Sequence, residues 1–209
     1  MALNPDTIPP SNFANAYADV PQPWDIPDPQ PALVAVADRI TGRLLDSGCG
    51  TGENAMFFAA RGCDVTGYDV VPFAIERAKE KAKEKGLEID FFVGDALKLS
   101  DWKAEEFDNV IDSGVFHVFS QEDARVYANG LKHVLKPGGH YFMLVFSDAE
   151  PGTQGPHRIP KQMIFDVFAN GWEVESVEET RYAMRPEYQG TRFSMGGAHN
   201  WFAIIRKTA

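Results

Sequence analysis

A glycine-rich segment, LLDSGCGTG at residues 44–52, has the spacing that most clearly indicates chemistry. Its glycines alternate with other residues at Gly48, Gly50 and Gly52, directly after an apolar run. Glycine permits a tight turn and lets a ligand approach the backbone. Asp69 ends the next apolar segment about 20 residues further on, where a carboxylate can accept hydrogen bonds from the ribose hydroxyls of a cofactor. The pattern predicts a cofactor site between a strand and a helix.

The acids around this loop favour a cofactor without phosphate. A dinucleotide fingerprint requires a third glycine where this chain has Glu53. Asp46, two residues before the loop, adds a negative charge that would repel a pyrophosphate. The same carboxylates suit a ligand with ammonium and sulfonium charges, such as S-adenosylmethionine. Three alternatives remain: a nicotinamide oxidoreductase, a non-catalytic cofactor-binding module, and a tight turn that holds no ligand.

His117 follows the fourth predicted strand and is the candidate catalytic residue. Because histidine can accept a proton near neutral pH, we expect His117 to act as a general base or to orient the substrate. A hydrogen-bonded structural histidine is the alternative. His157 and Arg158, on the loop after the fifth strand, are expected to bind a substrate oxygen or to belong to the loop surface. Flat apolar walls for an aromatic ring would come from Trp24, Phe116, Phe119 and Phe146.

No metal centre is predicted. Asp112 and Asp148 end the fourth and fifth predicted strands, but their spacing matches no metal motif. Cys49 and Cys63 form no C-x-x-C pair, which argues against a zinc site or a disulfide framework. This cysteine usage favours a reducing, cytoplasmic compartment.

The elements that must position these residues alternate along the chain. Apolar runs typical of strands occupy residues 43–48, 64–69, 88–95, 106–114 and 140–148. Helical patterns occupy residues 31–40, 52–62, 71–86, 121–135 and 160–171. Two further strands, at 172–184 and 199–208, have no helix between them and predict a terminal antiparallel hairpin. The alternation predicts an α/β fold with a doubly wound, mostly parallel sheet.

Residues 1–30 are expected to form an N-terminal arm or lid over the active site, and residues 31–209 to form the cofactor-binding domain. Closely spaced prolines exclude a long helix from the arm. Phe13, Tyr17 and Trp24 are large apolar groups that disordered leaders usually lack. We therefore expect the arm to be ordered.

The charge balance excludes several classes of partner. The formal net charge is −10, whereas proteins that bind nucleic acid or anionic membranes present basic surfaces. No apolar run approaches the roughly 20 residues that span a bilayer, and the first residues do not resemble a signal peptide. We expect a cytoplasmic protein whose partner is a small molecule.

The strings LLDSGCGTG, VTGYDVV and GDAL resemble the cofactor motifs of class I S-adenosylmethionine-dependent methyltransferases, and KPGG is similar to the turn before their fifth strand. The resemblance implies a Rossmann-like, seven-stranded sheet of order 3-2-1-4-5-7-6 with an antiparallel last strand. It also implies that the glycines flank the methionine part, that Asp69 holds the ribose, and that Asp95 with Ala96 lies against the adenine. The predicted cofactor contacts are Trp24, Asp46, Gly48, Gly50, Gly52, Asp69, Val70, Asp95, Ala96 and Asp112.

The string PWD at 23–25 followed by PQP at 29–31 resembles the N-terminal segment of small-molecule methyltransferases, both thiol or thiopurine enzymes and bacterial enzymes that act on hydroxyquinolones. The strings at 112–119 and 155–158 look most like the second group. That group usually has Gly-Arg before Pro-Gln-Pro, whereas Asp28 stands here, which leaves a basic contact at the pocket mouth unassigned. The resemblance implies methyl transfer to O, N or S of a small aromatic or heterocyclic substrate, such as a phenol or hydroxyquinolone. The predicted substrate contacts are Phe116, His117, His157 and Arg158.

Overall fold

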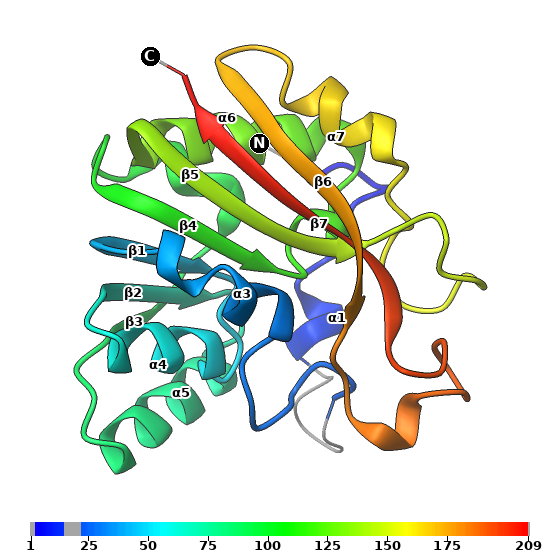
Figure 1. The fold of residues 1–209 in the computed structure, drawn as a ribbon, viewed down its shortest axis with the longest axis horizontal. Helices are drawn as coiled ribbons and strands as arrows, with labels where there is room; N and C mark the ends of the chain where they lie inside the picture. Colours follow the sequence, from blue (N-terminus) through cyan, green and yellow to red (C-terminus); the bar gives the residue numbers. More distant parts are fainter. Residues whose placement is uncertain (1–2, 15–21, 209) are drawn as a thin grey trace.

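Seven strands form one mixed sheet in the order β3-β2-β1-β4-β5-β7-β6 (Figure 1). The computed structural model describes residues 3–14 and 22–208. The strands are β1 Arg43–Ser47, β2 Asp64–Asp69, β3 Asp90–Val93, β4 Phe107–Ser113, β5 Leu135–Phe146, β6 Trp172–Tyr182 and β7 Ala198–Lys207. Pairing is parallel from β3 to β5, and β7 runs antiparallel to both β5 and β6. The predicted doubly wound sheet with its reversed last strand is confirmed.

Helices cover both faces of the sheet (Figure 1). One face packs against α3 Pro31–Ala35, α4 Glu53–Ala60 and α5 Pro72–Glu84, and the other against α6 Gln121–Val134 and α7 Lys161–Val167. Because both faces are covered, consecutive residues of the central strands are buried together instead of alternately. Leu44, Leu45, Val110 and Ile111 are fully buried for this reason. The remaining elements are α1 Ser11–Ala14, η1 Ala37–Arg39, η2 Ala96–Asp101, η3 Phe116–Val118 and η4 Pro186–Tyr188.

The fifth strand starts earlier than expected. The sequence predicts a turn at Lys136-Pro137-Gly138-Gly139, but β5 begins at Leu135, directly after α6. The pairing of β4 with β5 shifts register between Phe107 and Asn109, so the extra residues form an irregularity within the ladder. Gly138, with φ +77°, provides the left-handed backbone conformation at this point.

The described parts of the N-terminal arm are attached to the domain by hydrogen bonds. Thr7 Oγ1 donates to Asp123 Oδ2 at 2.6 Å, and Ser120 N donates to Thr7 Oγ1 at 2.8 Å. Further along, the side-chain amide of Gln30 forms two hydrogen bonds of 2.9 Å with the backbone of Ala183. The arm is thus held at both of its described ends. Tyr17, one of the aromatic residues predicted to order it, lies outside the described residues.

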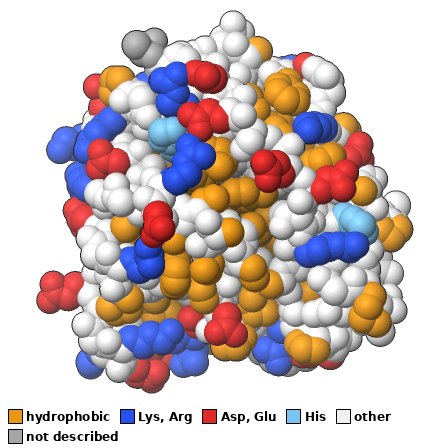
Figure 2. Space-filling view, viewed as in Figure 1, with side chains coloured by type: hydrophobic (Ala, Val, Ile, Leu, Met, Phe, Trp, Pro, Cys, Tyr) orange, Lys and Arg blue, Asp and Glu red, His pale blue; other side chains and the backbone are white. Residues whose placement is uncertain are grey.

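Charges of both signs are interspersed on the face shown in Figure 2, and apolar side chains gather near its middle. The face carries no extended basic patch of the kind that would attract a phosphate backbone. Within residues 3–14 and 22–208, no helix is long and apolar enough to cross a membrane.

Candidate active site

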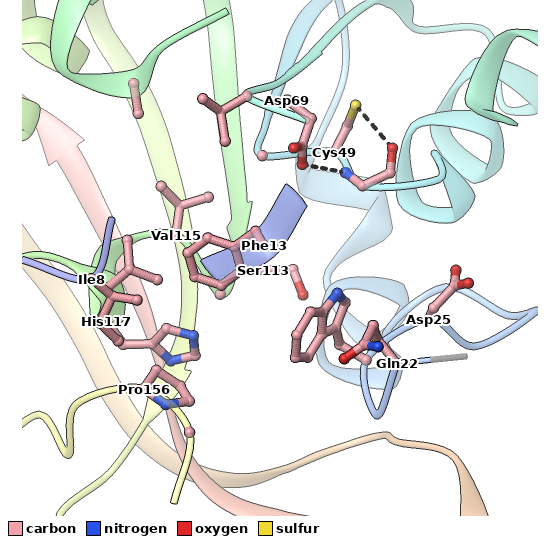
Figure 3. Close-up of a pocket in the computed structure, with 18 of the residues that line it drawn as sticks. Ile8, Phe13, Gln22, Asp25, Cys49, Asp69, Ser113, Val115, His117 and Pro156 are labelled. Atoms are coloured by element: carbon pink, nitrogen blue, oxygen red, sulfur yellow. Dashed lines mark hydrogen bonds between the residues drawn. The ribbon is translucent and has the colours of Figure 1, made fainter. Parts of the chain in front are cut away.

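A cavity of about 640 Å³ lies at the carboxyl ends of the parallel strands, where open α/β sheets bind ligands. Its walls come from the glycine loop, the ends of β2 and β4, the N-terminal arm, the loop after β5 and the connection between β6 and β7. Figure 3 shows Asp69 and Cys49 on one side, with His117, Ile8 and Pro156 on another. Eleven predicted site residues line the cavity: Trp24, Gly48, Gly50, Gly52, Asp69, Val70, Asp95, Ala96, His117, Phe119 and Phe146.

The glycine loop requires its glycines for two reasons. Gly48 has φ +64°, and a Cβ there would lie 2.1 Å from Val115 Cγ2 on the loop after β4. Gly52 caps α4 with φ +87°, a left-handed conformation that side chains disfavour. The loop is therefore a tight turn that leaves its backbone open toward the cavity.

Asp69 connects the end of β2 to this loop. Its Oδ2 accepts a hydrogen bond from Gly50 N at 3.0 Å (Figure 3), and its Oδ1 accepts one from Val71 N at 2.9 Å. Burial raises the pKa of the carboxyl group, and the two backbone donors oppose that shift. Each oxygen has further acceptor capacity toward the cavity. Such a carboxylate can accept from two hydroxyls on one ligand.

Asp46 lies behind the loop rather than on the cavity wall. It is 1% exposed, and its Oδ2 has no hydrogen-bond partner among the described residues. Burial raises its pKa well above the ordinary value, while the Ala55 backbone stabilises the charged form. The structure places Asp46 beneath the glycine loop, and its predicted cofactor contact stays a prediction. An unpartnered buried carboxylate oxygen favours an ammonium group or a water nearby.

The charge of Glu53 is balanced in the structure. Its carboxylate pairs with Lys81 at 3.0 Å and with Lys85 at 3.2 Å. Lys81 also donates to Thr51 Oγ1, which in turn donates to Asp25 Oδ1 at 2.6 Å. Because these ion pairs neutralise Glu53, the charge that would repel a pyrophosphate comes from carboxylates that have no ion pair. The sequence had suggested that Glu53 also contributes. The chain of contacts also joins the arm to the glycine loop.

The His117 ring lines the cavity but is tied into the protein. Phe146 N donates to its Nδ1 at 3.0 Å, so the neutral ring carries its proton on Nε2. Its Nε2 faces Gly114, where an added Cβ would lie only 3.2 Å away. Burial, together with the charges of His157 and Arg158, lowers the pKa of His117 to about 3.

This geometry argues against His117 as a general base. Its unprotonated nitrogen, Nδ1, already accepts a backbone hydrogen bond. A pKa of about 3 also makes the ring a weak proton acceptor at neutral pH. The two roles still consistent with the geometry are orienting the substrate and holding the loop after β4 against β5.

Asp112 lies in the core below the cavity rather than on its wall. Its carboxylate accepts from Val115 N at 2.7 Å, Phe116 N at 3.0 Å, Tyr141 Oη at 2.6 Å and Tyr127 Oη at 3.2 Å. Burial raises its pKa to about 6, against the effect of these donors. The predicted cofactor contact is corrected: Asp112 shapes the turn that leads to His117.

Phe116 is also a core residue. It is fully buried and packs against Phe168 with a centroid separation of 5.7 Å. The backbone bond from Phe116 N to Asp112 turns the side chain inward. Its predicted substrate contact is therefore corrected as well, and its neighbours Val118 and Phe119 line the cavity instead.

Arg158 and His157 organise the loop after β5. The Arg158 guanidinium donates to four backbone carbonyls, those of Glu150, Pro151, Gln154 and Pro156. His157 Nε2 lies 2.9 Å from the Asp6 carbonyl of the arm. Neither side chain lines the cavity, because Gly155 and Pro156 form that part of the wall. The predicted substrate contacts of Arg158 and His157 are corrected to loop and arm contacts.

A family model described as a methyltransferase domain matches residues 44–139. The 2-heptyl-1-hydroxyquinolin-4(1H)-one methyltransferase of Mycobacteroides abscessus is 32% identical over 191 residues, which are 88% of this chain and 81% of that protein. The chain belongs to the class I S-adenosylmethionine-dependent methyltransferases.

Further similarities cover most of the methyltransferase. The probable thiol methyltransferase 2 of Arabidopsis thaliana is 29% identical over 176 residues, 78% of this chain and 74% of that protein. A structure solved in a study of the conversion of a disulfide bond into a thioacetal group during echinomycin biosynthesis is 35% identical with a TM-score of 0.83. The matched region is 95% of this chain and 92% of the solved chain.

The cofactor of this methyltransferase is S-adenosylmethionine, and the alternatives of a nicotinamide oxidoreductase and a non-catalytic module are set aside. The residues present fit that cofactor. The Asp69 carboxylate suits the ribose hydroxyls, and the open glycine loop suits the methionine part. The unpartnered Oδ2 of Asp46 suits the amino group, reached through the loop. Asp95 and Ala96 line the same cavity where adenine is expected.

Several cavity residues of the methyltransferase escaped the sequence argument. They are Ile8 and Phe13 from the arm, and Met184, Arg192 and Phe193 from the connection between β6 and β7. The sequence of that connection predicts a polar loop, and its isolated aromatic and methionine residues are the only signal of a cavity wall. The fold brings these residues to the same cavity as the glycine loop, which local patterns do not reveal.

Proposed function

We propose that this methyltransferase transfers a methyl group to O, N or S of a small aromatic or heterocyclic substrate. The flat apolar walls of the cavity carry the proposal. Phe13 and Trp24 pack edge to face at 6.3 Å, and Phe146 packs against Phe193 at 5.5 Å. Aromatic walls of this kind suit a planar ring. The relatives named for a hydroxyquinolone and for thiols support the same substrate class.

We further propose that the accepting group ionises without a base from the protein. When bound, the cofactor would supply a methyl group on a positively charged sulfur. The acceptor's lone pair would bond to the methyl carbon while the carbon–sulfur bond breaks, with S-adenosylhomocysteine as the leaving group. His117 is the histidine among the described cavity residues, and its Nδ1 is occupied. Asp69 and Asp25 accept hydrogen bonds within the protein. The chain's contribution is therefore orientation and exclusion of water. Heteroaromatic thiols and N-hydroxy groups are acidic enough to react in this way.

We also propose that the arm is a lid and that the protein is cytoplasmic. Residues 1–30 would act as a lid, because their described parts line the cavity from above the glycine loop. A cytoplasmic location is supported by Cys49 and Cys63, both of which are free thiols.

The test is a series of phenols, N-hydroxyquinolones and heteroaromatic thiols of graded acidity, assayed with S-adenosylmethionine over a range of pH. We expect kcat/KM to rise with pH and to level off at each acceptor's own pKa. An inflection at one pH shared by all acceptors would instead identify a base on the protein. Absence of methyl transfer to every acceptor would refute the proposed substrate class.

A further inference from the structure

The described cavity lining carries many more acidic than basic side chains. The described lining carries five carboxylates, Asp25, Asp28, Glu53, Asp69 and Asp95, and a single permanent cation, Arg192. The carboxylates belong to the cofactor side: Asp69 and Asp25 bind the glycine loop directly, and Glu53 begins α4. Arg192, on the connection between β6 and β7, lies beside the loop after β5, where it contacts Gln154 and its neighbour Phe193 packs against Phe146.

Arg192 lacks a carboxylate partner among the described residues. Its Nε donates to the side-chain oxygen of Gln154 at 3.3 Å, and its guanidinium carbon lies 5.9 Å from the Tyr188 ring centroid. Neither neighbour is charged. Most other described arginines pair with an acid or, like Arg158, with several carbonyls. In a chain of net charge −10, a cavity arginine without an acid is unusual. Its terminal nitrogens are available for an anion.

The backbone around Arg192 is held firmly. Arg192 N and Phe193 N both donate to the Tyr188 carbonyl, and Gly190 N donates to the Phe193 carbonyl at 2.7 Å. The next residue, Ser194, donates its N–H to the Glu150 carboxylate. The Phe193 ring is buried against Phe146. Arg192 is therefore presented from a fixed turn beside the aromatic wall proposed for the acceptor ring.

We propose that Arg192 selects substrates that carry a carboxylate on the acceptor ring, away from the methylated atom. The guanidinium would bind the carboxylate through two parallel hydrogen bonds. Because Arg192 is exposed while its neighbour Phe193 is buried, the carboxylate would lie at the mouth and the ring inside. The inference rests on the proposed function, since it specifies the substrate class of the same cavity.

The test compares ring acids with their neutral amides. Three matched pairs serve as probes: 4-hydroxybenzoate, 4-mercaptobenzoate and 4-hydroxyquinoline-2-carboxylate, each against its carboxamide. Affinity is measured by calorimetry with S-adenosylhomocysteine bound, and kcat/KM is measured with S-adenosylmethionine. In the wild type we expect the best acid to bind about fivefold or more tightly than its amide, with the preference shrinking at high salt.

The variants separate this role from a structural one. Arg192→Met should abolish the preference for the acid, mainly by weakening the binding of the acid, and Arg192→Lys should retain part of the preference. Arg125→Met, on the exposed face of α6, changes the net charge equally and should keep the wild-type preference. Equal binding of acid and amide by the wild type, failure of every acid to bind, or a preference that survives Arg192→Met would overturn the inference.

These outcomes also distinguish the two proposals. Methylation of acids and amides at equal efficiency would refute the selection by Arg192 and support the proposed function. Acid-selective binding that depends on Arg192, without methylation of any probe or of the graded acceptors, would support the anion site and refute the proposed reaction.

Discussion

Replacing His117 with Asn tests whether this histidine is a buried neutral side chain. The Oδ1 of Asn lies at the same branch point as the Nδ1 of histidine, so Asn can still accept the hydrogen bond from Phe146 N. The substitution removes the titratable ring and keeps this backbone contact. Its main effect should therefore be on how stability depends on pH.

The sign and size follow from the pKa of about 3 in the folded protein, against about 6.5 in the unfolded chain. Below pH 6.5 the unfolded chain binds a proton at this position, whereas the folded protein does not until about pH 3. Acid therefore destabilises the wild type through His117 by about 1.4 kcal/mol per pH unit. Between pH 7 and pH 5 the wild type should lose about 2 kcal/mol more than His117→Asn.

The assay is urea unfolding of both proteins at pH 7, 6 and 5, and only the difference between them is interpreted. Asp112, with a pKa raised to about 6, also titrates in this range, but in the opposite sense: its contribution to stability increases as the pH falls from 6 towards 4. Both proteins retain Asp112, so its contribution largely cancels in the difference.

A constant difference between the two proteins from pH 7 to pH 5 would refute the claim that His117 is buried and neutral. The kinetic counterpart is equally direct. The acid limb of kcat/KM should show no inflection attributable to His117. An inflection near pH 6 to 7 that disappears in His117→Asn would restore the histidine as a proton acceptor.

Two further predictions follow from the site. Asp69→Ala should weaken S-adenosylmethionine binding by about 1 to 3 kcal/mol in calorimetry, because the ribose hydroxyls lose their acceptor. The control variant Asp64→Ala, at the exposed start of β2, should bind S-adenosylmethionine normally. Unchanged affinity in Asp69→Ala would show that this carboxylate does not hold the ribose. Deletion of residues 1–28 should leave a cooperatively folding domain in thermal unfolding but lower turnover far more than stability, and full turnover after deletion would show that the arm is no lid.

The sequence by itself determined the fold and the cofactor loop, because both depend on local patterns. Alternating strands and helices, with two final strands lacking a helix between them, fixed a doubly wound sheet with a terminal hairpin. The glycines at 48, 50 and 52 and the acid at Asp69 lie within short distances along the chain, where turn geometry and strand ends place them predictably. Asp69 and the loop therefore meet as expected.

Only the tertiary structure decided which polar side chains reach the cavity. His117 and Phe146 are 29 residues apart, yet their hydrogen bond fixes the tautomer of the ring. Arg158 is directed into its own loop by four carbonyls, whereas Arg192, from a loop without a recognisable pattern, reaches the cavity. The orientation and pKa of a side chain depend on partners brought together by packing of distant segments, and periodicity along a sequence carries no information about those partners.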